Sequence, residues 1–568
     1  MLPRLRLFAC LLCVVVALAC GTDDTSVQPA DLVLRGGSVV TVDAAVPDGQ
    51  ALAARGGRIL AVGSDEEIAG FIGEGTEVLE LDGATAIPGF VESHAHYMGV
   101  GRSTLQLDLM TVANWDEVVA MVEEAVAEAE PGEVITGRGW HQEKWDRRPD
   151  PQVEGLPHHD GLSAVSPDNP VVLTHASGHA AFANARAMEL AGITAATENP
   201  PGGEIVRDAS GEPIGAFRET AEGLLGPALE GAVAPEPARV ALLAQEEAFQ
   251  KGITSFHDAG ASFATVDLYR ELVDAGDLRI RLNVMIRSDL EDLAANMADY
   301  TMVGYGGDRL TVRTIKQSID GALGSHGAWL LEPYDDLPTS SGLNTLPPED
   351  VEGAAELALQ HDWQMAVHAI GDRANREVLD IFEAAQADGG QDLRWRIEHA
   401  QHLHPDDIPR FGDLGIIASM QGVHATSDGP WVEPKLGEER SEEGAYVWQR
   451  LVDSGATVTN GTDAPVEDVD PVASYYSTVS RMMATGERFY PEQALDRQTA
   501  LETYTINGAY AAFEEDLKGT LTPGKLADIT VLDTNPLTAP EAELAGARVM
   551  ATIVGAEVVY RAPDTGGS

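Results

Sequence analysis

Cysteine is almost absent from this sequence, and its distribution excludes several kinds of chemistry. The chain has 568 residues and three cysteines, all of which lie within the first 20 residues. The remaining chain therefore has no thiol for a disulfide, a catalytic thiolate or a cysteine-ligated zinc site. The sequence also has no GxSxG element, so a serine nucleophile of the elbow type lacks support.

Basic residues are scarce as well. Lysine and arginine together number 37 against 91 aspartates and glutamates, which gives a formal net charge of −54. This excess of negative charge disfavours nucleic acid as a partner, because the phosphates would be repelled. The acidic residues are spread along the whole chain, which is typical of a solvated surface; attraction of cationic substrates is the alternative interpretation.

The N-terminal segment has the features of an export signal. Two arginines precede the apolar run Leu7–Ala19, which is shorter than the roughly 20 residues that a transmembrane helix needs. We therefore expect residues 1–19 to be a signal peptide. The ending ALAC is similar to a bacterial lipobox, so acylated Cys20, followed by a polar tether over 20–30, would attach the protein to the cell envelope, on the periplasmic side or at the outer membrane. The alternative is an ordinary cleaved signal with an accidental cysteine.

The two ends of the remaining chain resemble each other. Short β-like runs alternate with glycine turns over 31–86, and the same pattern returns over 518–562, before a short tail at 563–568. We expect these ends to form one small composite β-sandwich. The middle, 87–517, alternates eight strand-like runs with helical patterns, which predicts an α/β protein built on a (β/α)8, TIM-like barrel.

A long insertion is predicted after the first barrel strand. Residues 100–235, approximately, separate that strand from the next candidate, GITSFHDAG, which is far more than a simple crossover requires. Long insertions at this end of a barrel commonly cover the active site.

Chemically reactive residues stand at the ends of the predicted barrel strands, where such barrels carry their active sites. The first strand ends in GFVESHAHYM, and strand alternation places its two histidines on one face. Imidazole nitrogen and carboxylate oxygen are the ligands of zinc and related hydrolytic metals. We therefore expect one or two divalent ions, zinc first, at a set of six residues: His94, His96, Lys316, His368, His399 and Asp463.

Lys316 is the unusual member of this set, because an ammonium group repels a cation. It becomes a ligand only if its neutral amine, which burial favours, reacts with carbon dioxide to give a carbamate that can bridge two ions. The chain has only six lysines, so a lysine inside a strand suggests that the amine itself is needed. A buried lysine paired with Asp320 or another acid is the alternative.

In combination, the motifs resemble the amidohydrolase superfamily, in particular the family 3 branch that includes N-substituted formamide deformylases. The similarity runs from about residue 31 to 560 and rests on HAH, TIKQSIDGALGSHGAWL, VHAIGDRAN, RIEHAQ, GTDAPVED and GTLTPGKLADITVLD. The resemblance implies that the histidines of the set and Asp463 bind metal and that a carbamylated Lys316 bridges the metal ions. It also implies a barrel with a composite sandwich.

The expected reaction is hydrolysis of a non-peptide C–N bond, of the amide or N-formyl type, in a small molecule. A divalent ion lowers the pKa of water to about 7 and polarises a carbonyl, and Asp463 would transfer the proton. Hydrolysis of an ester or lactone is an alternative that uses the same ligands. A second alternative is an envelope binding lipoprotein without catalysis. It predicts that some of the six metal-ligating residues are missing, and all six are present in the sequence.

Four further residues are expected to contact the substrate. His179 in ASGHAAFAN and Trp140 in a GW element match segments of the resembled branch, while Gln421 and His424 follow the seventh predicted strand. Trp140 is equally compatible with ordinary packing.

Overall fold

The structure of the protein is a computed structural model that describes residues 28–230, 235–387 and 392–563. The predicted signal peptide and Cys20 lie outside these residues. Within the described ranges, no helix is long and apolar enough to cross a membrane.

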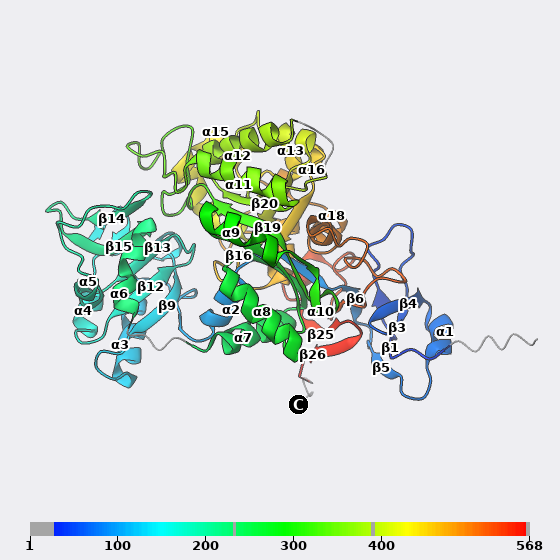
Figure 1. Cartoon of the computed structure of the whole chain (residues 1–568). Coiled ribbons are helices and arrows are strands. Elements are labelled where there is room, and N and C mark those ends of the chain that lie inside the picture. The colour runs from blue at the N-terminus through cyan, green and yellow to red at the C-terminus, as the bar shows by residue number, and fades with distance from the viewer. Residues whose placement is uncertain (1–27, 231–234, 388–391, 564–568) are drawn as a thin grey trace, which may run out of the picture.

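Eight parallel strands in the middle of the chain form a nearly closed barrel, which confirms the predicted fold class (Figure 1). In order around the barrel they are β7 (Phe90–Ala95), β16 (Ile253–Ala261), β17 (Arg281–Ile286), β19 (Leu310–Ser318), β20 (Gln364–Ala369), β21 (Arg396–His399), β22 (Ile417–Gln421) and β23 (Val458–Gly461). Most residues of these strands are buried, as expected for parallel strands that are covered by helices on the outside.

Helices between the strands cover the outside of the barrel. They include α7 (Pro237–Gln250), α8 (Phe263–Ala275), α9 (Leu290–Tyr300), α11 (Pro348–His361), α12 (Asp372–Ala385), α13 (Ile408–Leu414), α16 (Trp448–Asp453) and α17 (Pro471–Ser480). Their ends follow local signals: α8 starts where the Ser262 side chain accepts a hydrogen bond from the Thr265 backbone N–H, and it stops at Gly276, whose φ of 79° is left-handed.

The first and last barrel strands, β7 and β23, meet through the segments that carry the predicted ligands. The backbone N–H of Asp463 donates to the His94 carbonyl at 2.8 Å, and the His96 N–H donates to the Ala464 carbonyl at 2.8 Å. A Cβ atom at Gly461 would lie only 2.7 Å from the His94 backbone nitrogen, so glycine is needed for this approach. The contact places the first and eighth strand ends side by side.

Both chain ends contribute to the predicted sandwich. One sheet is formed by β4 (Arg58–Gly63), β3 (Ala51–Arg55), β1 (Leu32–Arg35) and β5 (Glu77–Glu80). The other combines β2 (Ser38–Val39) and β6 (Thr85–Pro88) with β24 (Ile529–Leu532), β25 (Val549–Val554) and β26 (Glu557–Arg561). A separate hydrophobic cluster, which includes Leu32, Leu52 and Ile553, fills the space between the two sheets.

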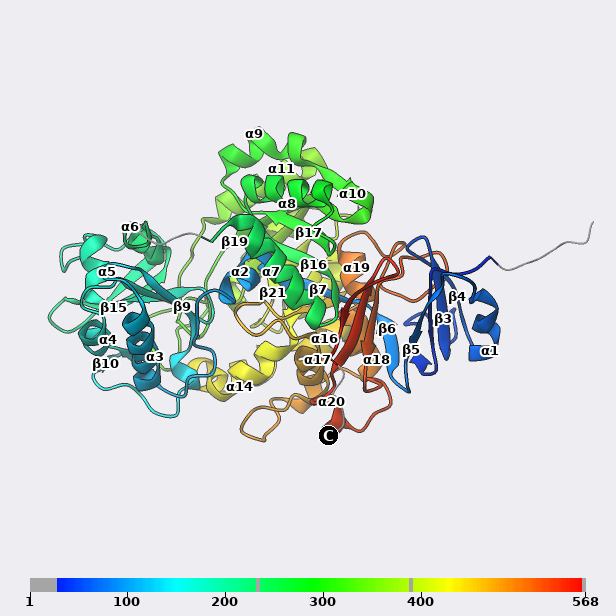
Figure 2. The same ribbon diagram turned by 90° about the horizontal axis from the view of Figure 1, so that it is seen from below.

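The insertion has a sheet and a core of its own. Its strands, in sheet order, are β14 (Gly203–Arg207), β15 (Pro213–Glu219), β13 (Ala180–Ala183), β12 (Val171–His175), β9 (Ile135–Trp140) and β8 (Leu107–Asp108). The helices α3 (Trp115–Glu128), α4 (Asp160–Val165) and α5 (Ala185–Leu190) accompany this sheet. In both views the insertion and the sandwich lie on opposite sides of the barrel (Figure 1 and Figure 2).

Candidate active site

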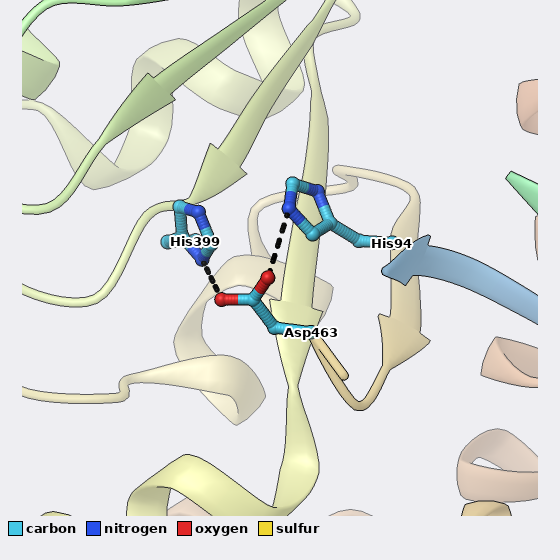
Figure 3. Close-up of side chains that lie close together, drawn as sticks. All are labelled: His94, His399 and Asp463. Carbon is cyan, nitrogen blue, oxygen red and sulfur yellow. Dashed lines mark ion pairs between the residues drawn. The ribbon is translucent and has the colours of Figure 1, made fainter. Parts of the chain in front are cut away.

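Three predicted ligands meet at the C-terminal end of the barrel strands (Figure 3). His94 Nε2 lies 3.4 Å from Asp463 Oδ1, and His399 Nδ1 lies 3.9 Å from Asp463 Oδ2. One candidate ligand atom from each of the three residues lies within 4.8 Å of the others, and all three side chains are buried. This spacing suits donors around a single cation.

Two more predicted ligands lie against this group. His96 Nε2 is 3.2 Å from Asp463 Oδ1, and the His368 ring lies 4.5 Å from the His399 ring, centroid to centroid. Among the described residues, His94 Nε2 and Asp463 Oδ1 are buried and make no hydrogen bond of acceptable geometry. The same holds for His368 Nε2, which lies 3.5 Å from Asp320 Oδ1. Because folded proteins rarely bury polar atoms unpaired, His94 Nε2 and Asp463 Oδ1 fit a bound divalent ion.

Lys316 lies in β19 and is 2% exposed. Burial lowers the pKa of its ammonium group to about 8. Asp320, its suggested partner, accepts hydrogen bonds instead from the backbone N–H groups of Trp329, Ile370 and Gly371. Among the described residues, no carboxylate lies within ion-pair distance of Lys316, so the structure does not contain the alternative pair with Asp320.

Buried side chains hold two of these histidines in place. His94 Nδ1 is hydrogen-bonded to the Glu398 carboxylate, which in turn pairs with the Arg396 guanidinium, and this arrangement directs Nε2 of His94 toward Asp463. His399 Nδ1 lies 2.8 Å from Gln421 Oε1. Such outer contacts fix the orientation of metal-binding rings. Gln421, expected to contact substrate, thus contacts a predicted ligand.

His179 reaches the barrel from the insertion. Its ring lies 5.0 Å from that of His368, and its Nδ1 is hydrogen-bonded to Glu219 Oε2 at 2.7 Å. Burial alone would lower the pKa of His179, but the Glu219 carboxylate raises it above the ordinary value. His179, expected to contact substrate, thus lies beside the predicted ligand His368, and Glu219, which holds it there, had no expected role.

Glu219 ends β15 in a left-handed conformation, with a φ of 51°. Its carboxylate enters a barrel loop at which Cβ atoms on Gly321 and Gly327 would lie 2.0 and 2.2 Å from Oε1. The glycines of the GALGSHG motif therefore make room for an acid that comes from the insertion. These glycines are a sequence signal that another group approaches the loop closely, but they do not show that this group is Glu219.

The other expected substrate contacts lie in different places. His424, in α14 (Gly422–Leu436), accepts a hydrogen bond from Gln401 Nε2 at 2.9 Å and has a buried, unpartnered Nε2 in the described structure. Trp140 is fully buried in the core of the insertion, and its Nε1 donates to the Leu173 carbonyl. This position agrees with the interpretation of Trp140 as a packing residue.

Two cavities adjoin the ligand group. The larger has a volume of about 520 Å³ and is lined by His96 and by several charged side chains. The smaller, of about 40 Å³, is lined by His399, His424 and Asp463 together with the apolar Leu323, Ile370 and Trp431. His179 lines both cavities, so it stands between them.

Comparison with known proteins identifies the family and several relatives of the chain. The sequence model of a family described as "Amidohydrolase family" matches residues 77–560. Protein LONG AFTER FAR-RED 3 of Arabidopsis thaliana is 35% identical, over 94% of this chain and 92% of that protein. An N-substituted formamide deformylase of Arthrobacter pascens is 30% identical, over 94% of this chain and 99% of that protein. A crystal structure described as an uncharacterized metal-dependent hydrolase from Pyrococcus horikoshii is 26% identical, covers 90% of this chain and 99% of that chain, and has a TM-score of 0.71.

Proposed function

The chain belongs to the amidohydrolase family, and we propose that it hydrolyses a non-peptide C–N bond, of the amide or N-formyl type, in a small-molecule substrate. The observation that carries this proposal is the convergence of His94, His399 and Asp463, with unpartnered buried donor atoms, at the active end of the barrel. The relative named N-substituted formamide deformylase supports the bond type.

We propose that the residues of the predicted set hold one or two divalent ions, zinc first. The residues are His94, His96, Lys316, His368, His399 and Asp463. Burial of Lys316 favours the neutral amine from which a carbamate forms. The carbamate would offer two oxygens to bridge two ions. When bound, such an ion supplies a lowered pKa for water, near 7, and polarises a carbonyl oxygen.

The side chains of the protein then handle the protons. Asp463 Oδ1 has no hydrogen-bond partner among the described residues and borders the smaller cavity, so it would accept a proton from the attacking water. The same carboxyl group would return that proton to the leaving nitrogen, so that an amine and an acid are released. His179, oriented by Glu219, would donate a hydrogen bond from Nε2 to the carbonyl oxygen as negative charge develops there.

Replacement of Asp463 by asparagine tests this role directly. Asp463→Asn keeps the size of the side chain but removes the proton acceptor, so turnover of an identified substrate should be abolished while circular dichroism and thermal unfolding remain those of the wild type. Wild-type turnover in this variant would refute the role. A matched panel of N-substituted formamides, other amides, esters and lactones tests the bond type, because turnover of the esters or lactones alone would contradict a C–N hydrolase.

We also propose that the protein is exported and held at the cell envelope through an acyl group on Cys20. Mass spectrometry of the mature N-terminus should find a lipid-modified Cys20 as its first residue. An unmodified N-terminus would contradict the anchor, whereas an intact residue 1 would contradict export by this signal.

A further inference from the structure

Three arginines line the larger cavity beside the predicted metal ligands, in a chain with a formal net charge of −54. Arg102 lies in α2 (Tyr97–Ser103), Arg138 lies in β9 of the insertion, and Arg287 directly follows β17. In the described parts of the chain, none of the three has a carboxylate within ion-pair distance, although acidic residues outnumber basic ones more than twofold. Three separate segments thus bring guanidinium groups to one cavity.

Arg138 is held in place by backbone groups instead of by an acid. Its Nε donates to the Pro465 carbonyl at 3.0 Å, and its Nη2 donates to the Ala176 carbonyl at 3.1 Å. Gly178, at a φ of +71°, packs against the guanidinium, because a Cβ there would lie 3.2 Å from Nη2. Carbonyl oxygens orient a guanidinium without neutralising it, so the positive charge of Arg138 remains available to a ligand.

Arg287 makes no side-chain hydrogen bond to another described residue. Its side chain is open to solvent in the cavity, yet the surrounding protein lowers its pKa through desolvation, an effect that the nearby Glu219 partly offsets. A guanidinium in such surroundings interacts with an anion more strongly than one in bulk water does. Arg287 therefore provides a second positive charge next to the site.

Three of the four acids that line the same cavity are hydrogen-bonded to groups other than these arginines. Asp258 accepts hydrogen bonds from the Tyr97 N–H and the Tyr269 hydroxyl. Asp320 is occupied by three backbone N–H groups, and Glu219 pairs with His179. Desolvation raises the pKa of Glu222 to about 8, which favours its neutral form at neutral pH.

From this arrangement we infer that the larger cavity is an anion subsite, in which Arg138 and Arg287, together with Arg102, bind a carboxylate group of the substrate. Planar guanidinium groups match the two oxygens of a carboxylate. The inference rests on the proposed function and narrows the substrate class to amides that carry a carboxylate group.

A pair of ligands without any C–N bond tests this subsite independently of hydrolysis. Isothermal titration calorimetry on the full-length, metal-loaded protein compares 3-phenylpropanoate with 3-phenylpropan-1-ol, which replaces the carboxylate by a neutral hydroxyl. We expect the carboxylate to bind at least about tenfold more tightly, which corresponds to about 1.4 kcal/mol. Equal affinities would overturn the inference.

Single replacements assign the preference to the arginines. In Arg287→Gln and in Arg138→Gln, the affinity ratio of the two ligands should fall to within about twofold, because the neutral amide cannot provide the charge. The control is Arg148→Gln, since Arg148 is exposed on the insertion and lines neither cavity, and this variant should keep the wild-type ratio.

A carboxylate preference that persists in both cavity variants would place the anion elsewhere, for example on the metal, and would overturn the subsite. The proposed function fails by a different observation, namely that no amide, formamide or other C–N substrate is hydrolysed. The binding ratios do not depend on that result, so the two failures are distinguishable.

Discussion

Glu219 of the insertion holds His179 beside the barrel residue His368: its Oε2 lies 2.7 Å from His179 Nδ1, and its carboxylate fits between two glycines of the barrel. The insertion therefore does more than cover the cavity, because it supplies both the histidine and the acid that orients it. A buried pair of this kind fixes the tautomer and direction of the imidazole.

Loss of the Glu219 charge should impair turnover without unfolding the protein. Glu219→Gln is expected to lower kcat by roughly 10- to 100-fold, which is less than the loss of a whole oxyanion donor. The glutamine amide still fits beside His179, but it no longer favours the same protonation state of the His179 ring. Steady-state kinetics should show the effect in kcat more than in KM. The control is Glu204→Gln in the same insertion, where Glu204 pairs with Arg218 and is substantially exposed. An unchanged kcat in Glu219→Gln would contradict the role of this pair.

Gln421 should matter for metal affinity. Gln421→Met removes the hydrogen bond to His399 Nδ1 at nearly constant volume, and we expect metal binding to weaken by about 10- to 100-fold in competition with a chelator. Gln401→Met is a matched control, because Gln401 is also buried but contacts His424, outside the proposed ligand set. Equal metal affinities for the two variants would show that the contact of Gln421 with His399 is unimportant.

Gly461 should be intolerant of any side chain. Gly461→Ala places a Cβ 2.4 Å from Glu92 Oε1 and 2.7 Å from the His94 backbone, so the junction of β7 and β23 must shift. Overpacking of this kind costs typically about 1–3 kcal/mol, which denaturant unfolding can measure. Gly70→Ala, where a Cβ would meet no atom within 4 Å, should have almost no effect. Equal stability of the two variants would contradict the close approach of Gly461 to His94 and Glu92.

The sandwich should lose its link to the barrel in acid. Asp528 forms a buried two-point pair with Arg281 of β17, at 2.6 and 2.9 Å. Burial would raise the pKa of Asp528, but Arg281 lowers it below the ordinary value. The pair therefore stabilises the folded state above about pH 4, and this stabilisation is lost as the pH falls through the lowered pKa.

Urea unfolding as a function of pH measures this contribution. Asp528→Asn should be destabilised by about 3–5 kcal/mol at pH 7, because it leaves a buried guanidinium unpaired, and its difference from the wild type should shrink below about pH 4. Asp533→Asn, in the more exposed pair with Arg548, should lose at most about 1 kcal/mol. A difference for Asp528→Asn that does not vary with pH would contradict the assignment.

The barrel could be predicted from the sequence because its signals are local. Each strand is a short apolar run, and the C-terminal ends of parallel strands share one edge, so His94, His399 and Asp463 could be placed together before any coordinates. Trp140 shows the limit of such reasoning, since an aromatic residue beside a predicted site packs in a core as readily as it lines a cavity.

The contacts between the insertion and the barrel could not be predicted. Glu219 meets Gly321 and Gly327 only because the insertion packs against a loop of the barrel. Arg138 is bound by backbone carbonyls, which every residue possesses and which leave no pattern in a sequence. Sequence periodicity predicts which residues are buried within an element, but it carries no information on which distant loops meet.

The metal content of the purified protein tests the central claim most directly. Elemental analysis of the wild type and of a His94→Asn, Asp463→Asn double variant gives the number of divalent ions per chain. We predict at least one tightly held ion in the wild type and its loss in the folded double variant. A wild-type protein that hydrolyses its substrate without any divalent metal, or a double variant that keeps the full metal content, would contradict the account.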